Sequence, residues 1–226
     1  MKILITGASG FIGSHLADAL HNKGHQLRCL VRTTSSLEWI KHLPVEYAYG
    51  TLFDTDALRK AVDHVDYIYH VAGLTKAKSR EEYFQGNQIA TRNLLDAVLA
   101  TNPTIKRFIH VSSQAAVGPS ITGTPVDEQT AFHPITAYGE SKMEAEKECL
   151  KRMAKLPITI TRPPAVYGPR DKDVFAFFDT MNKGLQPMIG FNNKEVSLIH
   201  VTDLVNGIVL AGEHPKGIGQ TYFISS

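Results

Sequence analysis

Residues 2–20 read KILITGASGFIGSHLADAL, an apolar run joined to a helical pattern through a loop rich in glycine. Gly7, Gly10 and Gly13 occupy every third position of that loop. The first glycine permits a tight turn, the second lets a ligand approach the backbone, and the third lets the helix pack on the sheet. The unpaired N–H groups at the start of the helix then favour an anion such as a pyrophosphate. The stretch therefore predicts a strand–turn–helix unit that binds a dinucleotide.

The composition is that of an ordinary globular chain. It has 226 residues, a net charge of +2 and 43% hydrophobic residues. The charge balance argues against a nucleic-acid partner, and no apolar run reaches the roughly 18–20 residues that span a bilayer. Cys29 and Cys149 lie far apart and are expected to be reduced thiols, and the first residues show no signal-peptide pattern, so we expect a cytoplasmic protein. His21 and His25 lack an accompanying Glu, so we expect no metal site.

Apolar strand-like runs alternate with helical patterns along most of the chain. This order predicts an α/β fold, a Rossmann-type doubly wound parallel sheet covered on both faces. The long loop 118–136 is expected to be functional. The expected strands are 2–6, 26–31, 67–71, 107–111 and 158–161, and the expected helices are 11–21, 52–62, 83–100 and 138–154.

Several further motifs follow the glycine loop in a fixed order: HVAG at 70–73, NQIATRN at 87–93, VSS at 111–113, YGESK at 138–142, RPPAVYGP at 162–169 and HVTD at 200–203. Together with TGASGFIG they resemble the extended short-chain dehydrogenase/reductases, the NAD(P)-dependent epimerase/dehydratase group, and especially its dihydroflavonol-reductase-like branch. The resemblance departs at Ala90, where the family usually has Gly, and at Val117, where many sugar-nucleotide members have Tyr.

The resemblance implies a division of the chain into a dinucleotide-binding domain, residues 1–163, a partial substrate lobe, residues 164–198, and a return to the sheet, residues 199–226. The lobe is small, either truncated at Ser226 or naturally short. The resemblance also implies a homodimer formed through the helices at 83–100 and 138–154. The implied cofactor-binding residues are Gly7, Gly10, Phe11, Ile12, Gly13, Arg32, Leu52, Ala72, Tyr138, Lys142, Pro163 and Val166.

Tyr138 and Lys142 lie four residues apart, so both side chains share one face of a helix. A free phenol has a pKa near 10, but a cationic lysine and a positively charged nicotinamide ring favour the phenolate and lower that pKa. Tyr138 can then exchange a proton with a substrate hydroxyl or carbonyl while hydride moves to or from the cofactor. The resemblance implies Ser113 rather than Ser112 as the catalytic serine, by the family's spacing to Gly118, and its hydroxyl would hydrogen-bond the same oxygen.

The end of the second strand bears on the choice of cofactor. NAD-specific members carry an acidic residue there, which binds both ribose hydroxyls. Val31 occupies that position, and Arg32 and four hydroxyl residues follow it. A guanidinium and hydroxyl donors suit a 2′-phosphate, so the prediction is NADP, with NAD as the alternative. Thr51 replaces the Asp that usually contacts the adenine, which puts that contact in doubt.

Three functions are compatible with these motifs. A reductase or dehydrogenase of a hydroxy or keto compound comes first, a nucleotide-sugar epimerase/dehydratase second, and a non-catalytic NADP(H)-binding sensor third. Asn87 is expected either to support the active site or to cap a helix, and His70 and His110 to be satisfied core or near-site residues. The segment 144–152 is expected to be a solvated helix face. Most of the apolar residues of the lobe are expected to pack on the sheet: Phe175, Phe177, Phe178, Met181 and Met188.

Overall fold

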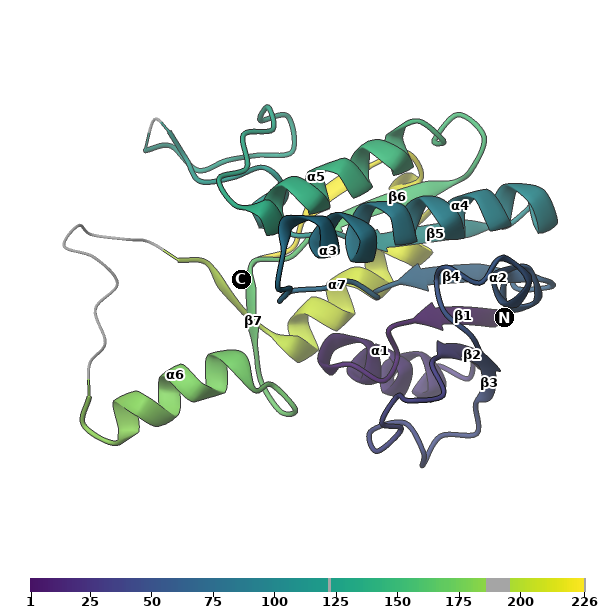
Figure 1. Ribbon diagram of the computed structural model, residues 1–226, viewed down its shortest axis with the longest axis horizontal. Coiled ribbons are helices and arrows are strands. Elements are labelled where there is room, and N and C mark those ends of the chain that lie inside the picture. Colours follow the sequence, from purple (N-terminus) through teal and green to yellow (C-terminus); the bar gives the residue numbers. More distant parts are fainter. Residues whose placement is uncertain (122, 186–195, 226) are drawn as a thin grey trace.

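The computed structural model describes residues 1–121, 123–185 and 196–225. Seven parallel strands form its central sheet in the order β3-β2-β1-β4-β5-β6-β9 (Figure 1). A separate parallel pair, β7-β8, lies beside this sheet. The strands are β1 (Lys2–Thr6), β2 (Gln26–Val31), β3 (Glu46–Tyr49), β4 (Tyr67–His70), β5 (Arg107–Val111), β6 (Ile158–Arg162), β7 (Ala165–Tyr167), β8 (Leu198–His200) and β9 (Thr221–Phe223). The predicted doubly wound parallel sheet is confirmed, and its strand order reverses next to β1.

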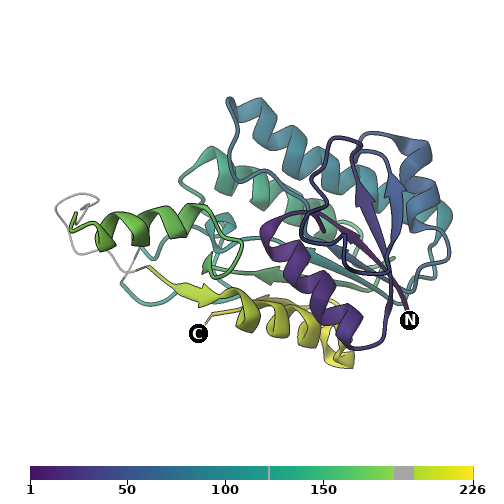
Figure 2. The same cartoon turned by 90° about the horizontal axis from the view of Figure 1, so that it is seen from below.

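Helices cover both faces of the sheet (Figure 2). One face carries α1 (Phe11–Asn22) and α7 (Val201–Glu213). The other carries α2 (Thr55–Val62), α4 (Ala90–Thr101) and α5 (Ala137–Leu150). A short helix, α3 (Arg80–Phe84), leads into α4 through a π-helical segment, Gln85–Ile89, and α6 (Asp173–Asn182) stands away from the sheet.

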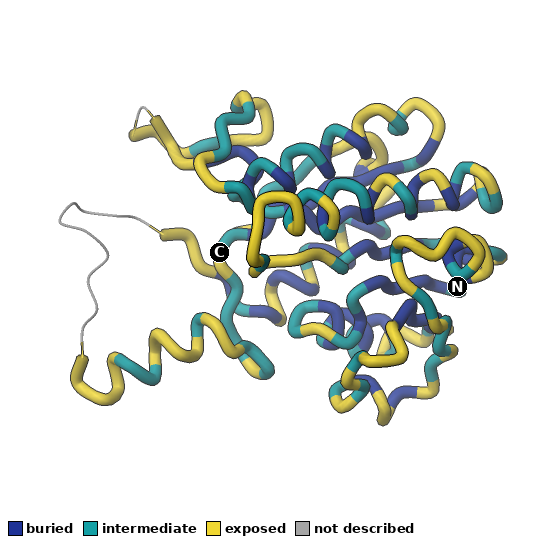
Figure 3. Tube along the Cα trace, in the orientation of Figure 1, coloured by how far each residue is buried: buried dark blue, intermediate teal, exposed yellow. Residues whose placement is uncertain are grey.

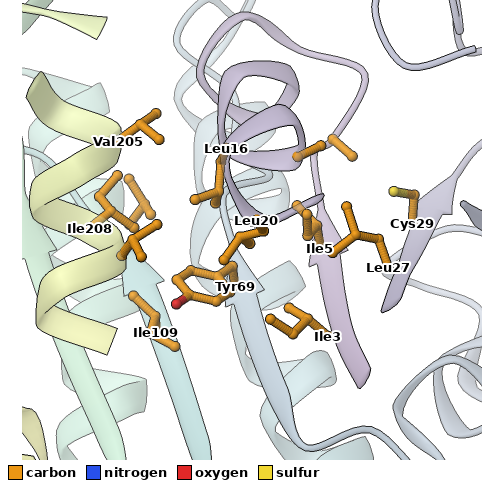
Figure 4. Packing of buried hydrophobic residues seen from close by; sticks show 14 of the residues in the cluster. Ile3, Ile5, Leu16, Leu20, Leu27, Cys29, Tyr69, Ile109, Val205 and Ile208 are labelled. Carbon is orange, nitrogen blue, oxygen red and sulfur yellow. The ribbon is translucent and has the colours of Figure 1, made fainter. Parts of the chain in front are cut away.

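Successive side chains of the strands point to opposite faces of the sheet and enter two hydrophobic cores, one on each face. On β1, Ile3 and Ile5 face the core under α1 and α7, whereas Leu4 faces the core under α2 and α4. Figure 4 shows the first core, in which Leu16 and Leu20 of α1 meet Ile208 of α7 above the sheet. Each such side chain, fully buried, contributes about 1.5–3 kcal/mol relative to an exposed one. These two layers hold the carboxyl ends of β1, β4, β5 and β6 in a fixed arrangement.

The predicted elements occur in the structure in the expected order, with several differences. Helix α5 ends at Leu150 rather than at Ala154, and β7 and β8 were not expected from the sequence. The predicted helix at 52–62 begins only at Thr55, because the carboxylate of Asp54 accepts the Ala57 N–H at 3.0 Å and caps the helix there. The predicted helix at 83–100 is three segments with a π-helical turn in the middle. Neither α6 nor α7 was expected from the sequence.

The expectation that the apolar residues of the lobe pack on the sheet is wrong for α6. Phe175 is 62% exposed, and Phe177, Phe178 and Met181 are also exposed (Figure 3). Helix α6 contacts β7 rather than the large sheet, so its apolar residues have no core to enter. Met188 lies outside the described residues.

The expectation of a solvated face at 144–152 is also wrong in part. Glu146 is fully buried and Glu148 is buried, because each pairs with an arginine. Among the helices of residues 1–121, 123–185 and 196–225, none is long and apolar enough to cross a membrane.

Candidate active site

The glycine loop is closed tightly on itself and on β4. Gly7 has a φ of +77°, and a Cβ there would lie 2.7 Å from the backbone nitrogen of Ala72. A Cβ on Gly13 would lie 2.1 Å from the carbonyl oxygen of Gly7, so helix α1 can approach the loop only without one. Helix α1 begins directly after Gly10, which is exposed and supplies no side-chain cap. The first-turn N–H groups therefore remain available, and this cradle fits the pyrophosphate of a dinucleotide.

A buried hydrogen-bond chain holds this loop against its neighbours. The Thr6 hydroxyl lies 2.7 Å from His70 Nδ1, and His70 Nε2 lies 2.9 Å from the Thr91 hydroxyl. Thr91 donates its single hydrogen to the Asn87 carbonyl, so it must accept from His70 Nε2–H, and Nδ1 must accept from Thr6. Burial lowers the pKa of His70 to about 3, which agrees with this neutral tautomer. The Ala72 N–H in turn donates to Thr6 Oγ1 at 3.3 Å.

His70 thus satisfies the expectation of a satisfied core histidine, whereas His110 does not. His110 stands beside it on β5, with 5.4 Å between the ring centroids. It is buried, and within the described residues neither ring nitrogen has a hydrogen-bond partner. Burial and the charge of Lys142 lower the pKa of His110, so its ring is neutral.

A cleft of about 950 Å³ opens at the carboxyl ends of β4, β5 and β6. In open parallel α/β sheets this edge is where ligands bind. The sequence-predicted residues that line it are Phe11, Ile12, Ser113, Tyr138, Lys142, Pro163 and Val166. Five others, Gly7, Gly10, Gly13, Arg32 and Leu52, are not part of the lining, and Ala72 lies behind it against Gly7.

Ser113 and Tyr138 face each other in this cleft. Ser113 Oγ accepts the Ala115 N–H at 3.2 Å, at the start of a short 3-10 turn, and its hydrogen bond to Tyr138 lowers the pKa of the phenol. Burial acts in the opposite direction and is the larger cause, so the pKa of Tyr138 lies above its usual value. Ser112 is buried and, among the described residues, its hydroxyl has no partner. The choice of Ser113 over Ser112 therefore agrees with the geometry.

Lys142 lies one helical turn behind Tyr138 on α5. Its Nζ donates to the Val111 carbonyl at 2.9 Å, and burial lowers its pKa to about 8. We expected Lys142 to lower the pKa of Tyr138, but the hydrogen bond from Ser113 is what opposes burial there. Because Nζ is directed to the end of β5, the lysine acts on the phenol only at longer range.

Asn87 ties the π-helical segment to the catalytic helix. Its side-chain nitrogen donates to the Leu74 carbonyl at 3.0 Å and to the Ser141 hydroxyl at 2.8 Å. Its side-chain oxygen accepts the Leu74 N–H at 2.7 Å. Ser141 then donates to the Tyr138 carbonyl at 2.7 Å. Asn87 is therefore a supporting residue of the site, and the alternative of a helix-start cap is wrong.

Two residues beside Tyr138 were not anticipated from the sequence. The ring of Tyr83 packs against Tyr138 with 6.0 Å between centroids. Thr136 caps α5, because its hydroxyl accepts the Gly139 N–H at 3.0 Å, and it thereby fixes where the catalytic helix begins. The Thr136 cap could have been found from the sequence, since a Thr directly before a helical pattern is a typical cap. The contact of Tyr83 has no comparable signal.

The end of β2 forms a small turn on the surface. Val31 is buried in the core, and Arg32 is exposed. The Arg32 N–H donates to the Ser35 hydroxyl at 3.1 Å, and the Ser35 N–H donates back to the Arg32 carbonyl at 2.9 Å. The turn leaves the guanidinium in solvent at the end of the strand. At the end of β3, Leu52 packs on the second core and its carbonyl accepts from the Asn93 side chain.

Residues 3–225 match the family described as NAD dependent epimerase/dehydratase. The chain belongs to this family. A 3β-hydroxysteroid dehydrogenase/Δ5→4-isomerase from Mycobacterium tuberculosis is 30% identical over 242 residues, covering 99% of this chain and 64% of that protein. A ceramide reductase from Caulobacter vibrioides is 33% identical over 207 residues, covering 92% of this chain and 59% of that protein.

Solved structures of the family agree with the fold. A UDP-glucuronic acid 4-epimerase from Bacillus cereus, in complex with UDP-glucuronic acid and NAD, matches with a TM-score of 0.85 and 28% identity. The match covers 100% of this chain and 78% of that one. The chain thus spans about three fifths of the length of the two curated relatives. The family is named for its dependence on NAD.

Within the described residues, no group of three or more His, Cys, Asp or Glu side chains could hold a metal ion.

Proposed function

We propose that this protein is an NAD(P)-dependent oxidoreductase of the extended short-chain type, acting on a carbinol or carbonyl. The observation that carries the proposal is the cleft that Ser113, Tyr138 and Lys142 line together, with the glycine cradle beside it. Gly7, Gly10 and Gly13, with the first turn of α1, would hold a nicotinamide dinucleotide. Such a cofactor, when bound, supplies or accepts the hydride.

The protein's own residues handle the proton. Tyr138 donates its phenolic proton to the substrate oxygen during reduction, or removes one from the carbinol during oxidation. Ser113 donates a hydrogen bond to the same oxygen and stabilises the charge that develops there. The positive charge of Lys142 favours the phenolate that reduction leaves behind. Asn87 and Ser141 hold the start of α5, and with it the position of Tyr138.

The experiment is a screen of ketones and alcohols that follows the absorbance of the reduced nicotinamide, with Tyr138→Phe beside the wild type. Tyr222→Phe is the matched control, because that exposed hydroxyl contacts only the Lys216 carbonyl among the described residues. We expect Tyr138→Phe to lose at least about a hundredfold in kcat, the usual size of an acid–base contribution. Unchanged turnover in Tyr138→Phe would remove the proposal. Cofactor binding without any turnover in the wild type would favour the non-catalytic sensor.

NADP is the proposed cofactor, with NAD the alternative. The support is the buried Val31, which leaves the end of β2 without a carboxylate, and the exposed guanidinium of Arg32 next to it. Fluorescence titration with NADPH and NADH tests this, using Arg32→Ala and, as control, the exposed Arg92→Ala on α4. We expect Arg32→Ala alone to remove most of a preference for NADPH. Equal affinity for both cofactors in the wild type would assign NAD instead.

Nucleotide-sugar epimerisation is the second candidate, supported by the likeness to the UDP-glucuronic acid 4-epimerase. The charges of the cleft favour the reductase. Among the described residues that line it, the cationic ones are Lys142 and Arg162, and both already contact protein groups. Neither cation is therefore free to form a charge-assisted hydrogen bond with the diphosphate of a nucleotide sugar. The relatives named for a 3β-hydroxysteroid and a ceramide support a neutral, apolar substrate.

A homodimer and a cytoplasmic location also belong to this proposal. The dimer would pair the outer faces of α4 and α5, as the family resemblance implies. Light scattering of the purified protein tests it, and a mass of one chain at micromolar concentration would contradict it. Fractionation of the source cells tests the location.

A further inference from the structure

A charged residue continues the catalytic stripe of α5 into the interior. Tyr138, Lys142 and Glu146 follow one another at intervals of four residues, so they lie on one face of the helix. Lys142 is 5% exposed and Glu146 is fully buried. A carboxylate at such a depth is costly unless it is paired and hydrogen-bonded. Glu146 therefore needs a partner that pairs with its carboxylate and hydrogen-bonds its oxygens.

That partner is Arg162, the last residue of β6. Its Nε lies 3.1 and 3.2 Å from the two carboxylate oxygens of Glu146, and its Nη2 lies 2.7 Å from one of them. The guanidinium is itself buried and lies over the rings of Phe132 and Phe223, 5.2 and 5.3 Å from their centroids. A planar cation that pairs with a carboxylate through two nitrogens and contacts two aromatic rings is held in one orientation.

Of the titratable groups that face Lys142, Glu146 is the one that carries a negative charge. His70 and His110 are neutral, because burial lowers the pKa of both. Burial likewise raises the pKa of the Cys149 thiol and of Tyr138, so both are protonated near neutrality. Burial lowers the pKa of Lys142 to about 8, and the charge of Glu146 is the largest effect that opposes this.

We propose that Glu146 and Arg162 form a positioning pair for catalysis: Arg162 holds the carboxylate of Glu146 in place on the stripe of α5, and this carboxylate keeps Lys142 cationic behind Tyr138. The inference rests on the proposed function, in which the charge of Lys142 favours the phenolate. Neither residue touches the reacting atoms, so both act through Lys142. The pair also joins α5 to β6, the strand that leads directly into Pro163 of the cleft.

The experiment measures the protonation of Lys142 directly, without any substrate. The protein is labelled with carbon-13 at the lysine Cε, and the shift of this carbon is followed against pH, with Lys142→Arg to assign the resonance. We expect Glu146→Gln to move the titration midpoint of Lys142 to lower pH by about one unit or more. Glu148→Gln, a buried carboxylate on the same helix that pairs with Arg152, is the matched control and leaves the midpoint in place.

Glu146→Gln leaves the buried guanidinium of Arg162 without its carboxylate partner, so folding of this variant is checked by circular dichroism. The double variant Glu146→Leu/Arg162→Leu removes both charges together and keeps the test available if the single variant unfolds. Glu146→Asp retains the carboxylate and restores the midpoint at least in part. In the enzyme assay, kcat/KM of Glu146→Gln falls about tenfold at pH 8 relative to pH 6, beyond the change in the wild type.

A Lys142 midpoint that is the same in wild type, Glu146→Gln and the double variant overturns the inference. That result leaves the proposed function untouched, since turnover and its loss in Tyr138→Phe are measured separately. Conversely, a shifted midpoint in a protein without turnover removes the proposed catalysis but keeps the electrostatic link between Glu146 and Lys142.

Discussion

Replacing Gly13 or Gly10 with alanine separates the packing role of the glycine loop from its ligand role. A Cβ on Gly13 would lie 2.1 Å from the Gly7 carbonyl oxygen and 2.7 Å from its carbon. Ordinary contact begins near 3.4 Å, so α1 or the loop must move by about 1.3 Å. At Gly10 the nearest atom is the same oxygen at 3.3 Å, which a small adjustment accommodates.

The energies follow from these distances. Overpacking against backbone costs up to about 3 kcal/mol, and alanine returns about 1 kcal/mol of helix propensity, so Gly13→Ala destabilises by about 2 kcal/mol. For a chain of this size that lowers Tm by about 4–8 °C. Gly10→Ala is close to neutral, because a poorer cap offsets a smaller unfolded-state entropy. We expect both variants to weaken cofactor binding at least about tenfold, a loss of about 1.4 kcal/mol.

Thermal unfolding followed by circular dichroism gives the stability, and fluorescence titration with NADPH and NADH gives the binding. The reasoning fails if Gly13→Ala keeps the wild-type Tm, because the close approach of α1 would then not exist. It also fails if Gly10→Ala binds both cofactors as the wild type does, because the exposed face of the loop would then not meet the ligand.

Three further predictions concern residues behind and beside the cleft. Ser113→Ala removes the hydrogen bond that lowers the pKa of Tyr138, so it moves the titration of this phenol to higher pH and reduces kcat by about a hundredfold. Asn87→Ala removes two hydrogen bonds to the backbone of Leu74 and a buried one to the Ser141 hydroxyl, and lowers the free energy of unfolding by about 1–3 kcal/mol in chemical denaturation. His70 has a pKa depressed from 6.5 to about 3, so the unfolded chain binds the extra proton and stability falls as pH drops through this window. His70→Asn therefore reduces the pH dependence of unfolding there by up to about 1.4 kcal/mol per pH unit.

Each of these has a matched control on the same chain. Ser112→Ala, with a buried hydroxyl that has no partner among the described residues, leaves the Tyr138 titration unchanged. Asn93→Ala loses the one bond to the Leu52 carbonyl and costs less than Asn87→Ala. The exposed His64→Asn, which removes a histidine from the surface, is the control for His70→Asn. Equal effects in variant and control would show that the named contacts do not carry the difference.

The parallel sheet could be predicted because each buried strand is a short apolar run that ends at a turn or a polar residue. Lys2–Thr6 and Arg107–Val111 were expected with the bounds that the structure shows. The sequence did not predict helix α7, because its thirteen residues are apolar on most sides and no glycine follows them to mark its end. Helix α6 was missed because its aromatic residues suggested packing on the sheet, whereas in the structure it contacts β7 and most of its apolar residues stay exposed.

Within the site, the spacing of residues along the sequence predicted which side chains share one helix face. The contacts between different helices and strands could be seen only in the structure. The interval of four residues predicted that Tyr138 and Lys142 share a helix face. Glu146 lies one interval further along, but we expected its carboxylate to be in solvent, because the sequence does not indicate that Arg162 pairs with it. Ser113 was predicted from its distance along the chain to Gly118 in the family that the sequence resembles, and it lines the cleft beside Tyr138. The direction of the Lys142 Nζ toward the Val111 carbonyl could not be predicted, because it depends on the packing of α5 against β5.

The π-helical turn at Gln85–Ile89 acts as a spacer one residue longer than a regular helix requires. Everything before it, including Tyr83, is rotated relative to α4 by the angle of one residue, about 100°. Deleting Gln88 would let α3 and α4 fuse into a single regular helix. Tyr83 would then turn away from Tyr138, and Asn87 would lose its place between Leu74 and Ser141. The length of this one turn therefore keeps Tyr83 and Asn87 facing their partners on helix α5.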